Sequence, residues 1–216
     1  MTGSIVVLIS GHGSNLQSLL KYSQPESFKG KVDLVLSNRS DATGLKIAQE
    51  AGVRTRLIDH QNYQSREAFE LDLIKQIDSV GPDLVVLAGF MRIFTNIFVA
   101  HYAERIMNIH PSLLPKYPGL DTHQKALQNG DRYAGATVHY VTAELDHGPA
   151  IIQAKIPILK GDDSKSLGAR VLNVEHEIYP EAISWHLKGR LELKNNYVFR
   201  DGIPLPHTGF QWETTT

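Results

Sequence analysis

Two unbroken runs of apolar, β-forming residues constrain this chain more than any other feature. Residues 5–9 and 84–88 each have the length of a strand and contain no polar residue. A strand without polar alternation is buried on both faces, as in a parallel sheet covered by helices. Both runs are too short to span a bilayer. The pattern therefore predicts a layered α/β fold around a mostly parallel sheet.

Helical and strand patterns alternate through the first half of the chain. Further strands are predicted at residues 32–36, 54–57 and 106–110, and helices at residues 16–20, 44–51, 65–80, 97–102 and 122–129. This alternation is typical of right-handed crossovers and predicts a Rossmann-like half.

The pattern changes in the second half of the chain. Residues 135–141 and 150–156 are strand-like and joined by a short connection, so they are expected to pair antiparallel. A last helix begins near Lys165 and is expected to kink or restart at Pro180. We predict one domain over residues 1–216, divided into a Rossmann-like half, a C-terminal half and a tail at residues 1–110, 111–190 and 191–216.

Composition limits the classes of function. The 216 residues carry a formal net charge of -1 and contain no cysteine. Disulfides, thiolate metal sites and cysteine nucleophiles are therefore excluded. With no charged-then-apolar leader, the chain is expected in the cytoplasm. The balanced charge favours neither nucleic acid nor a membrane as main partner. The ten histidines are scattered without metal-ligand spacing, so no metal is expected.

A glycine loop, residues 10–15 (SGHGSN), follows the first strand. It lacks the Gly-Lys-Ser/Thr of a P-loop, and Leu16 stands where the dinucleotide fingerprint has its third glycine. Gly13, Ser14 and Asn15 are consistent with a monophosphate pocket at a helix N-terminus. They are equally consistent with a tight turn in which Ser14 or Asn15 caps the helix.

The strand at residues 106–110 carries two polar side chains. Asn108 and His110 are expected on one face, with Met107 and Ile109 on the other face, toward a core. Pro111 favours an extended backbone at His110. Ligands bind at the carboxyl ends of parallel strands. Asn108 and His110 are therefore a candidate catalytic pair, although an isolated Asn-x-His is more often structural.

Three other features have both a functional and a structural interpretation. Arg66 in the first turn of a helix opposes the helix dipole at about 0.3–1 kcal/mol, so it either meets an anion or reaches into solvent. Residues 89–94 would form a wall for a flat ring, or ordinary core. Residues 175–177 (EHE) are interpreted as a solvated helix face, with Glu175 at the margin of the buried stripe.

Together, several of these segments resemble one enzyme family. Asn108, His110 and Asp146, the Gly-Ser-Asn loop, residues 89–92 (GFMR) and residues 110–115 (HPSLLP) resemble the folate-dependent phosphoribosylglycinamide formyltransferases over about residues 5–190. The HPSLLP run is specific to the formyltransferase superfamily, and its extension KYPG points to this branch. The resemblance implies metal-free transfer of the formyl group of 10-formyltetrahydrofolate to the amine of glycinamide ribonucleotide, by a mixed sheet with helices on both faces.

The resemblance also implies a role for each site residue. Protonated His110 and the Asn108 amide would donate to the formyl oxygen, while Asp146 would raise the pKa of the imidazole and relay the amine's proton. The ribonucleotide would contact Gly13, Ser14, Asn15, Pro111 and Glu175. The folate would contact Arg66, Met91, Arg92, Ile93, Phe94, Asn108, Thr142, Ala143, Glu144, Leu145 and Asp146. The partners would be these small molecules, and the chain a monomer or weak homodimer.

Departures from the family pattern and alternative functions remain open. His147 stands where a small residue is expected, and would stiffen its loop or compete for Asp146. Asp121 stands where relatives often carry a neutral or basic residue. A methionyl-tRNA formyltransferase would need an extra domain. A formyltetrahydrofolate hydrolase usually carries an added N-terminal domain, whereas the first strand here begins at Ile5. A third alternative is a non-enzymatic Rossmann-type nucleotide-binding module.

Overall fold

The computed structural model describes residues 2–24 and 26–213. The predicted domain and tail also include residues 1, 25 and 214–216, which lie outside the described residues. The chain divides into two compact units, Met1–Met107 and Asn108–Thr216, and each is described by itself. The assignment of the whole chain to a single domain stays a prediction.

The first unit is built on a parallel sheet. Its strands follow the order β5-β4-β1-β2-β3, where β5 contributes only its first two residues. β1 pairs in parallel with both β2 and β4, and residues 5–9 are fully buried. The parallel sheet predicted from unbroken apolar runs is confirmed. The strands are β1 (Gly3–Ile9), β2 (Gly30–Ser37), β3 (Arg54–Leu57), β4 (Leu84–Leu87) and β5 (Ile106–His110).

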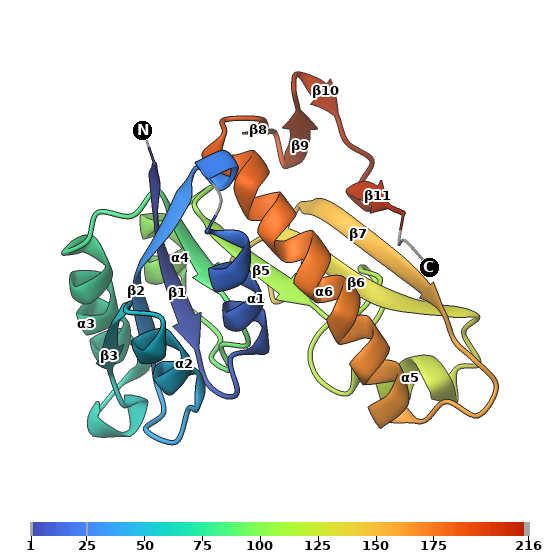
Figure 1. Ribbon diagram of the computed structural model, residues 1–216, viewed down its shortest axis with the longest axis horizontal. Helices are drawn as coiled ribbons and strands as arrows, with labels where there is room; N and C mark the ends of the chain where they lie inside the picture. The colour runs from blue at the N-terminus through green and yellow to red at the C-terminus, as the bar shows by residue number, and fades with distance from the viewer. Residues whose placement is uncertain (1, 25, 214–216) are drawn as a thin grey trace. The chain divides into compact units, whose positions relative to one another are not determined.

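Helices cover both faces of this sheet. α1 packs with α2, and α3 packs with α4. Figure 1 shows the two pairs on opposite faces, as right-handed crossovers require. α3 begins after Ser65, whose hydroxyl accepts a hydrogen bond from the Ala68 amide. The helices are α1 (Ser14–Tyr22), α2 (Gly44–Glu50), α3 (Arg66–Asp78) and α4 (Asn96–His101), with single 3-10 turns at Glu26–Phe28 and His60–Asn62.

The second unit combines a mixed sheet, two helices and a small separate sheet. The strand order is β11-β7-β6-β5, with the predicted antiparallel β6–β7 pair and a parallel β7–β11 pair. β8, β9 and β10 form an antiparallel sheet of their own. The elements are α5 (Thr122–Gln128), β6 (Tyr133–Tyr140), β7 (Ala150–Pro157), α6 (Ser164–Leu187), β8 (Leu191–Lys194), β9 (Tyr197–Arg200), β10 (Ile203–Pro204) and β11 (Phe210–Trp212).

The long helix α6 continues through Pro180 and packs on α5, β6 and β7 (Figure 1). The expected restart at Pro180 is therefore wrong. Proline removes one backbone hydrogen bond, whereas the helix buries Val171 and Ile178 before Pro180 and Ile183 after it. Burial of this continuous stripe outweighs the lost bond. No helix in the described part of the chain is long and apolar enough to cross a membrane.

Candidate active site

Residues 111–119, within the segment between β5 and α5, rest on buried polar side chains of β6 and β7. Thr137 Oγ1 donates to the Ser112 carbonyl at 2.7 Å and accepts from the Leu114 amide at 3.2 Å. Gln153 Nε2 donates to Thr137 Oγ1 and to the Leu114 carbonyl, both at 3.0 Å. A satisfied buried network of this kind holds a loop in one conformation. Side chains of β6 and β7 therefore fix the position of the segment that follows His110.

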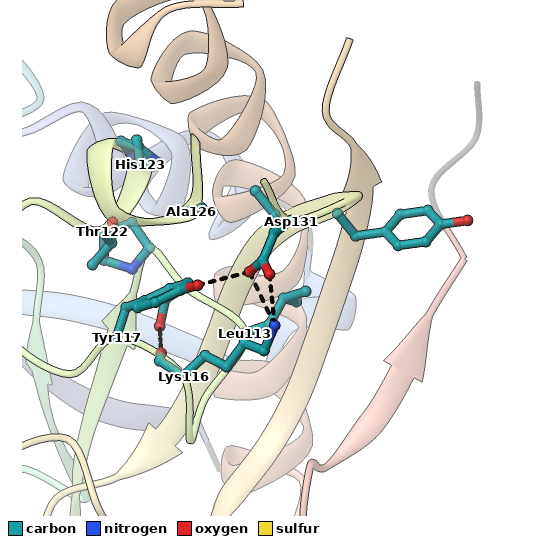
Figure 2. A pocket seen from close by; sticks show the side chains of 11 residues that line it. Leu113, Lys116, Tyr117, Thr122, His123, Ala126 and Asp131 are labelled. Carbon is teal, nitrogen blue, oxygen red and sulfur yellow. Dashed lines mark hydrogen bonds and ion pairs between the residues drawn. The ribbon is translucent and has the colours of Figure 1, made fainter. Parts of the chain in front are cut away.

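The same segment is also fixed by an ion pair. Lys116 Nζ lies 2.9 and 3.0 Å from the two carboxylate oxygens of Asp131, and the Tyr117 hydroxyl donates to Asp131 at 2.9 Å. Figure 2 shows the three side chains converging. The hydrogen bond from Lys116 is the largest cause holding the pKa of Asp131 below its usual range, and the Tyr117 hydroxyl adds to it. Asp131 thus remains a carboxylate and an acceptor.

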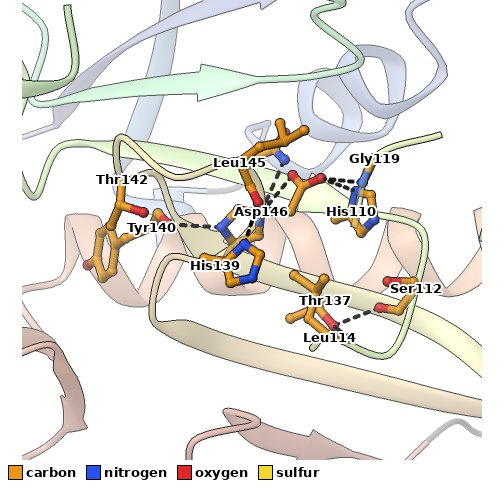
Figure 3. Close-up of polar contacts among 12 residues, drawn as sticks. His110, Ser112, Leu114, Gly119, Thr137, His139, Tyr140, Thr142, Leu145 and Asp146 are labelled. Carbon is orange, nitrogen blue, oxygen red and sulfur yellow. Dashed lines mark hydrogen bonds and ion pairs between the residues drawn. The ribbon is translucent and has the colours of Figure 1, made fainter. Parts of the chain in front are cut away.

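His110 and Asp146 meet at the end of β5. His110 Nδ1 lies 3.4 Å from Asp146 Oδ2, and both side chains are 7% exposed. His110 Nε2 lies 2.9 Å from the Tyr117 carbonyl oxygen. A carbonyl only accepts, so Nε2 carries a hydrogen. The Nδ1 edge of the ring therefore faces Asp146 (Figure 3).

Asp146 is held by backbone as well as by histidine. The Gly119 amide donates to Asp146 Oδ2 at 2.9 Å. Asp146 has φ 55°, a left-handed conformation that is uncommon for a residue with a side chain. Such conformations persist only where surrounding contacts require them, and they gather at functional sites. The constrained backbone of the short connection between β6 and β7 therefore places the buried Asp146 carboxylate beside His110.

Asn108 also belongs to this cluster, through a histidine that the sequence analysis missed. Asn108 Nδ2 lies 3.2 Å from His139 Nε2, and His139 Nε2 lies 3.8 Å from Asp146 Oδ1. The structure thus brings the three predicted residues together around His139. The available signal was a histidine within the apolar strand at residues 135–141, two residues from buried Thr137 on the same face.

Burial controls the protonation of His139. Its side chain is 2% exposed, and burial lowers the pKa of His139 to about 4 against smaller opposing effects of Tyr140 and Asp146. The ring is therefore neutral at pH 7. Its Nδ1 lies 2.8 Å from the Tyr140 carbonyl, which places the single hydrogen on Nδ1. The unprotonated Nε2 then accepts from Asn108 and leaves the second amide hydrogen of Asn108 available.

The rest of the β6–β7 connection lies nearer the solvent. Leu145 is 45% exposed, Ala143 and Glu144 are exposed, and Thr142 is partly exposed. His147 Nδ1 lies 2.6 Å from the Leu145 carbonyl, and His147 Nε2 lies 3.7 Å from Glu144. His147 therefore bonds within its own loop, as one of the two expectations for it stated. Its expected competition for the Asp146 carboxylate is wrong.

The glycine loop of the first unit lines a pocket. Residues 10–15 and Ala88, Gly89 and Met91 enclose about 270 Å³. Gly13 precedes α1 with φ 77°, and Ser14 and Asn15 are the first two helical residues. The interpretation of Ser14 or Asn15 as the helix cap is therefore wrong. A Cβ at Gly13 would lie 2.7 Å from Gly44 Cα, so this position requires glycine.

The segment after β4 has both buried and exposed side chains. Phe94 is buried and stacks on Phe98 with ring centroids 3.8 Å apart, which is core packing. Met91 and Ile93 are 64% and 52% exposed, and Arg92 is partly exposed. The interpretation as core therefore holds for the Phe94 ring, whereas a wall for a flat ring stays a prediction for the exposed side chains on either side of Arg92.

Buried Ser10 joins this segment to the glycine loop. The Met91 amide donates to Ser10 Oγ at 2.8 Å, and Ser10 Oγ donates to Asn38 Oδ1 at 2.5 Å. Ser10 directly precedes Gly11, so one hydroxyl bonds the start of the segment at residues 91–94 to the start of the glycine loop. A shift of one segment therefore strains the other.

Three more predicted binding residues differ in exposure. Arg66 is exposed and makes no ion pair with another described residue. Pro111 is partly exposed. Glu175 is 7% exposed, so its interpretation as part of a solvated helix face is wrong. Glu175 follows Val174 and precedes Ile178 by three positions, which turns it toward the buried stripe of α6.

Residues 2–24 and 26–213 contain no group of three or more His, Asp or Glu side chains that could hold a metal ion.

The chain is similar to known proteins over most of its length. Residues 4–183 match the formyl transferase family model. Phosphoribosylglycinamide formyltransferase of Escherichia coli K12 is 52% identical over 96% of this chain and 98% of its own. A solved phosphoribosylglycinamide formyltransferase of Coxiella burnetii has TM-score 0.95 and 49% identity, covering 99% of this chain and all of that one. Glycinamide ribonucleotide transformylase 1 of Symbiobacterium toebii has TM-score 0.90 and 45% identity over 92% and 94%.

The fold, the Asn108–His139–Asp146–His110 cluster and the family match define the class of this protein as a formyl transferase. Sequence identity of about half to these relatives, across nearly the whole length of the chain, identifies the family within that class. The chain belongs to the phosphoribosylglycinamide formyltransferase family, whose members carry out a formyl transfer step of purine biosynthesis. The family resemblance found in the sequence is thereby confirmed, and a purely nucleotide-binding module is set aside.

Proposed function

We propose that this chain transfers the formyl group of 10-formyltetrahydrofolate to the amine of glycinamide ribonucleotide. The observation that carries the proposal is the 3.4 Å contact between His110 Nδ1 and the buried carboxylate of Asp146. An imidazole, a carboxylate and an amide donor within one cluster suit acyl transfer to an amine. The names of the relatives support this choice of acceptor.

The first task of the cluster is to stabilise negative charge. As the amine nitrogen bonds to the formyl carbon, charge develops on the formyl oxygen. In the imidazolium form, His110 donates to that oxygen from Nδ1 while Nε2 stays on the Tyr117 carbonyl. Asn108 adds the amide hydrogen that His139 does not use. Removing one such donor typically lowers the rate by about 10²–10³-fold.

The second task is to move a proton. The attacking amine becomes positively charged and must lose a proton, and the folate nitrogen must gain one as its bond to the formyl carbon breaks. Asp146 takes the amine's proton, directly or through one water, and returns it toward the folate nitrogen. Proton transfers of this kind are worth about 10²–10⁴-fold. Asp146 also balances the charge of the adjacent His110 imidazolium.

Binding roles are proposed for the remaining predicted residues. The ribonucleotide phosphate lies at the helix N-terminus formed by Gly13, Ser14 and Asn15, where backbone amides and the helix dipole favour an anion. Pro111 and Glu175 contact the same substrate. The folate is held by Arg66, Met91, Arg92, Ile93, Phe94, Asn108, Thr142, Ala143, Glu144, Leu145 and Asp146. We further propose that the chain acts in the cytoplasm as a monomer or weak homodimer.

An absorbance assay of folate deformylation, with and without glycinamide ribonucleotide, tests the reaction. Deformylation that requires the amine, with one formylated ribonucleotide formed per folate released, supports the proposal. Equal deformylation without the amine would instead assign a hydrolase. Ribonucleotide binding without any reaction of the folate would also contradict the proposal.

A further inference from the structure

Asp131 lies outside the reacting cluster but is bonded to it through the loop. It lies in the turn after α5, and its side chain is 16% exposed. Its carboxylate accepts from Lys116 Nζ and from the Tyr117 hydroxyl, so it bonds two consecutive residues of the segment that follows β5 (Figure 2). Asn129 Nδ2 also donates to the Tyr117 hydroxyl at 3.0 Å. The Tyr117 side chain thus has two polar partners beyond α5.

The backbone of the same two residues faces the opposite way, toward β5. The Tyr117 carbonyl accepts from His110 Nε2 at 2.9 Å, and the Lys116 carbonyl accepts from Ser112 Oγ at 2.7 Å. Tyr117 has φ 57°, a left-handed conformation that a tyrosine rarely adopts. External bonds are needed to hold it there. The bonds to Asp131 are the ones that fasten both neighbouring side chains.

We propose that Asp131 is a positioning residue for His110: by fastening Lys116 and Tyr117, it fixes the Tyr117 carbonyl that holds His110 Nε2 and so keeps Nδ1 toward Asp146. The proposal rests on the proposed role of His110. It assigns a task in catalysis to an ion pair that touches no reacting atom.

The link between Asp131 and His110 acts through the orientation of the imidazole ring. His110 has a buried donor at Nε2, and a buried donor that loses its acceptor turns toward another. If the Tyr117 carbonyl moves, the imidazole rotates and Nδ1 leaves the position it shares with Asp146. Misplacement of a catalytic group by about 1 Å can lower the rate by about 10²-fold. Loss of the fastening should therefore lower kcat without changing how the substrates bind.

The decisive variant is Asp131→Ala, measured for kcat, for both KM values and by ¹⁵N-edited NMR of the His110 ring, assigned through its loss in His110→Gln. We expect kcat to fall by about 10–100-fold, both KM values to change less than about twofold, and the His110 Nε2–H signal to shift or broaden. Asp131→Asn, which retains an acceptor oxygen, should fall between wild type and Asp131→Ala. A wild-type kcat or an unchanged Nε2–H signal in Asp131→Ala overturns the proposal.

Asp201→Ala is the matched control, since Asp201 is bonded by Arg190 through three hydrogen bonds in the same unit. It should keep wild-type kcat and the wild-type His110 signal. If it lowers kcat as much as Asp131→Ala does, loss of any ion pair explains the effect and the proposal is overturned. Should Asp131→Ala not fold, Tyr117→Phe retains the carbonyl and removes the hydroxyl, together with its hydrogen bonds to Asp131 and Asn129. A reduced kcat there supports the proposal, and a wild-type kcat overturns it.

Asp146→Asn separates this proposal from the proposed function. Slow turnover in Asp146→Asn together with normal turnover in Asp131→Ala would overturn only the positioning role. Normal turnover in Asp146→Asn would overturn the proposed mechanism instead. The NMR measurement needs no turnover, so it tests the link between Asp131 and the His110 ring in either case.

Discussion

The Asn108 amide faces His139, with Asn108 Nδ2 3.2 Å from His139 Nε2. The bond orients the amide because neutral His139, with its hydrogen on Nδ1 toward the Tyr140 carbonyl, offers only an acceptor at Nε2. A protonated His139 would repel the amide hydrogens and turn the Asn108 oxygen toward the ring. Donation from Asn108 to a substrate oxygen therefore depends on keeping His139 unprotonated.

His139→Leu should lower kcat by about 10-fold while KM for the ribonucleotide stays close to that of the wild type. In His139→Leu the Asn108 amide remains but is poorly oriented as an oxyanion donor. The reduction in kcat should therefore be somewhat smaller than the reduction caused by removing the donor completely. Steady-state kinetics with both substrates measures it. His101→Asn, at a histidine paired with Asp78 on the surface, is the control and should behave as wild type. A wild-type kcat in His139→Leu would remove His139 from the account.

The stability of the chain should also depend on pH through His139. Burial lowers the pKa of His139 from 6.5 to about 4 in the folded state. The contribution of neutral His139 to the free energy of unfolding is fully present above pH 6.5. It is lost as the pH falls toward 4, because the unfolded chain binds the proton at a higher pH than the folded chain does. At about 1.4 kcal/mol per pKa unit, the loss amounts to about 3 kcal/mol.

Urea unfolding of the wild type and of His139→Leu between pH 7 and pH 4 measures this contribution. The free energy of unfolding should fall less steeply with decreasing pH in His139→Leu than in the wild type. The difference between the two curves isolates His139 from the carboxylates that titrate over the same range. Parallel curves would show that His139 titrates alike in the folded and unfolded chains.

Ser14→Ala and Asn15→Ala should raise KM for the ribonucleotide by about 10-fold or more and change KM for the folate little. A hydrogen bond to a charged group contributes about 1.5–3 kcal/mol, which corresponds to such a factor. Initial rates with each substrate varied in turn separate the two constants. Equal effects on both substrates would contradict the assignment of the glycine loop to the phosphate.

Ser10→Ala should raise both KM values together, by a few-fold each. The Ser10 hydroxyl bonds the Met91 amide and Asn38, so its removal leaves a partly buried amide without its acceptor and loosens two binding segments. Asn38→Asp keeps an acceptor for the Ser10 hydroxyl and should be milder. A change in only one KM would show that the two segments respond independently.

Much of the fold could be predicted from the chain because its strands are unusually apolar. Residues 5–9 and 84–88 contain only apolar residues, and burial on both faces is the arrangement that hides them. Asn108 and His110 followed from strand alternation and from the proline after His110. Asp146 followed from the family resemblance, because the short connection between two antiparallel strands has no regular pattern of its own.

The missed features depend on tertiary contacts that no local pattern encodes. His139 lies in a buried strand, and its partner Asn108 is 31 positions away. The acceptor for His110 is a backbone carbonyl at Tyr117, which any residue type would supply. α6 continues through Pro180 because burial on either side outweighs one lost hydrogen bond. Local propensity predicts a break there, whereas packing maintains the helix.

Asp146→Asn tests the central claim most directly, since the amide keeps the shape of the carboxylate and an acceptor oxygen for Gly119 but removes its charge and its ability to take a proton. The measurement is single-turnover formyl transfer from 10-formyltetrahydrofolate to glycinamide ribonucleotide, with binding of both substrates measured in parallel. We predict a rate lower by about 10³-fold with unchanged binding. A rate within a few-fold of wild type would contradict the account.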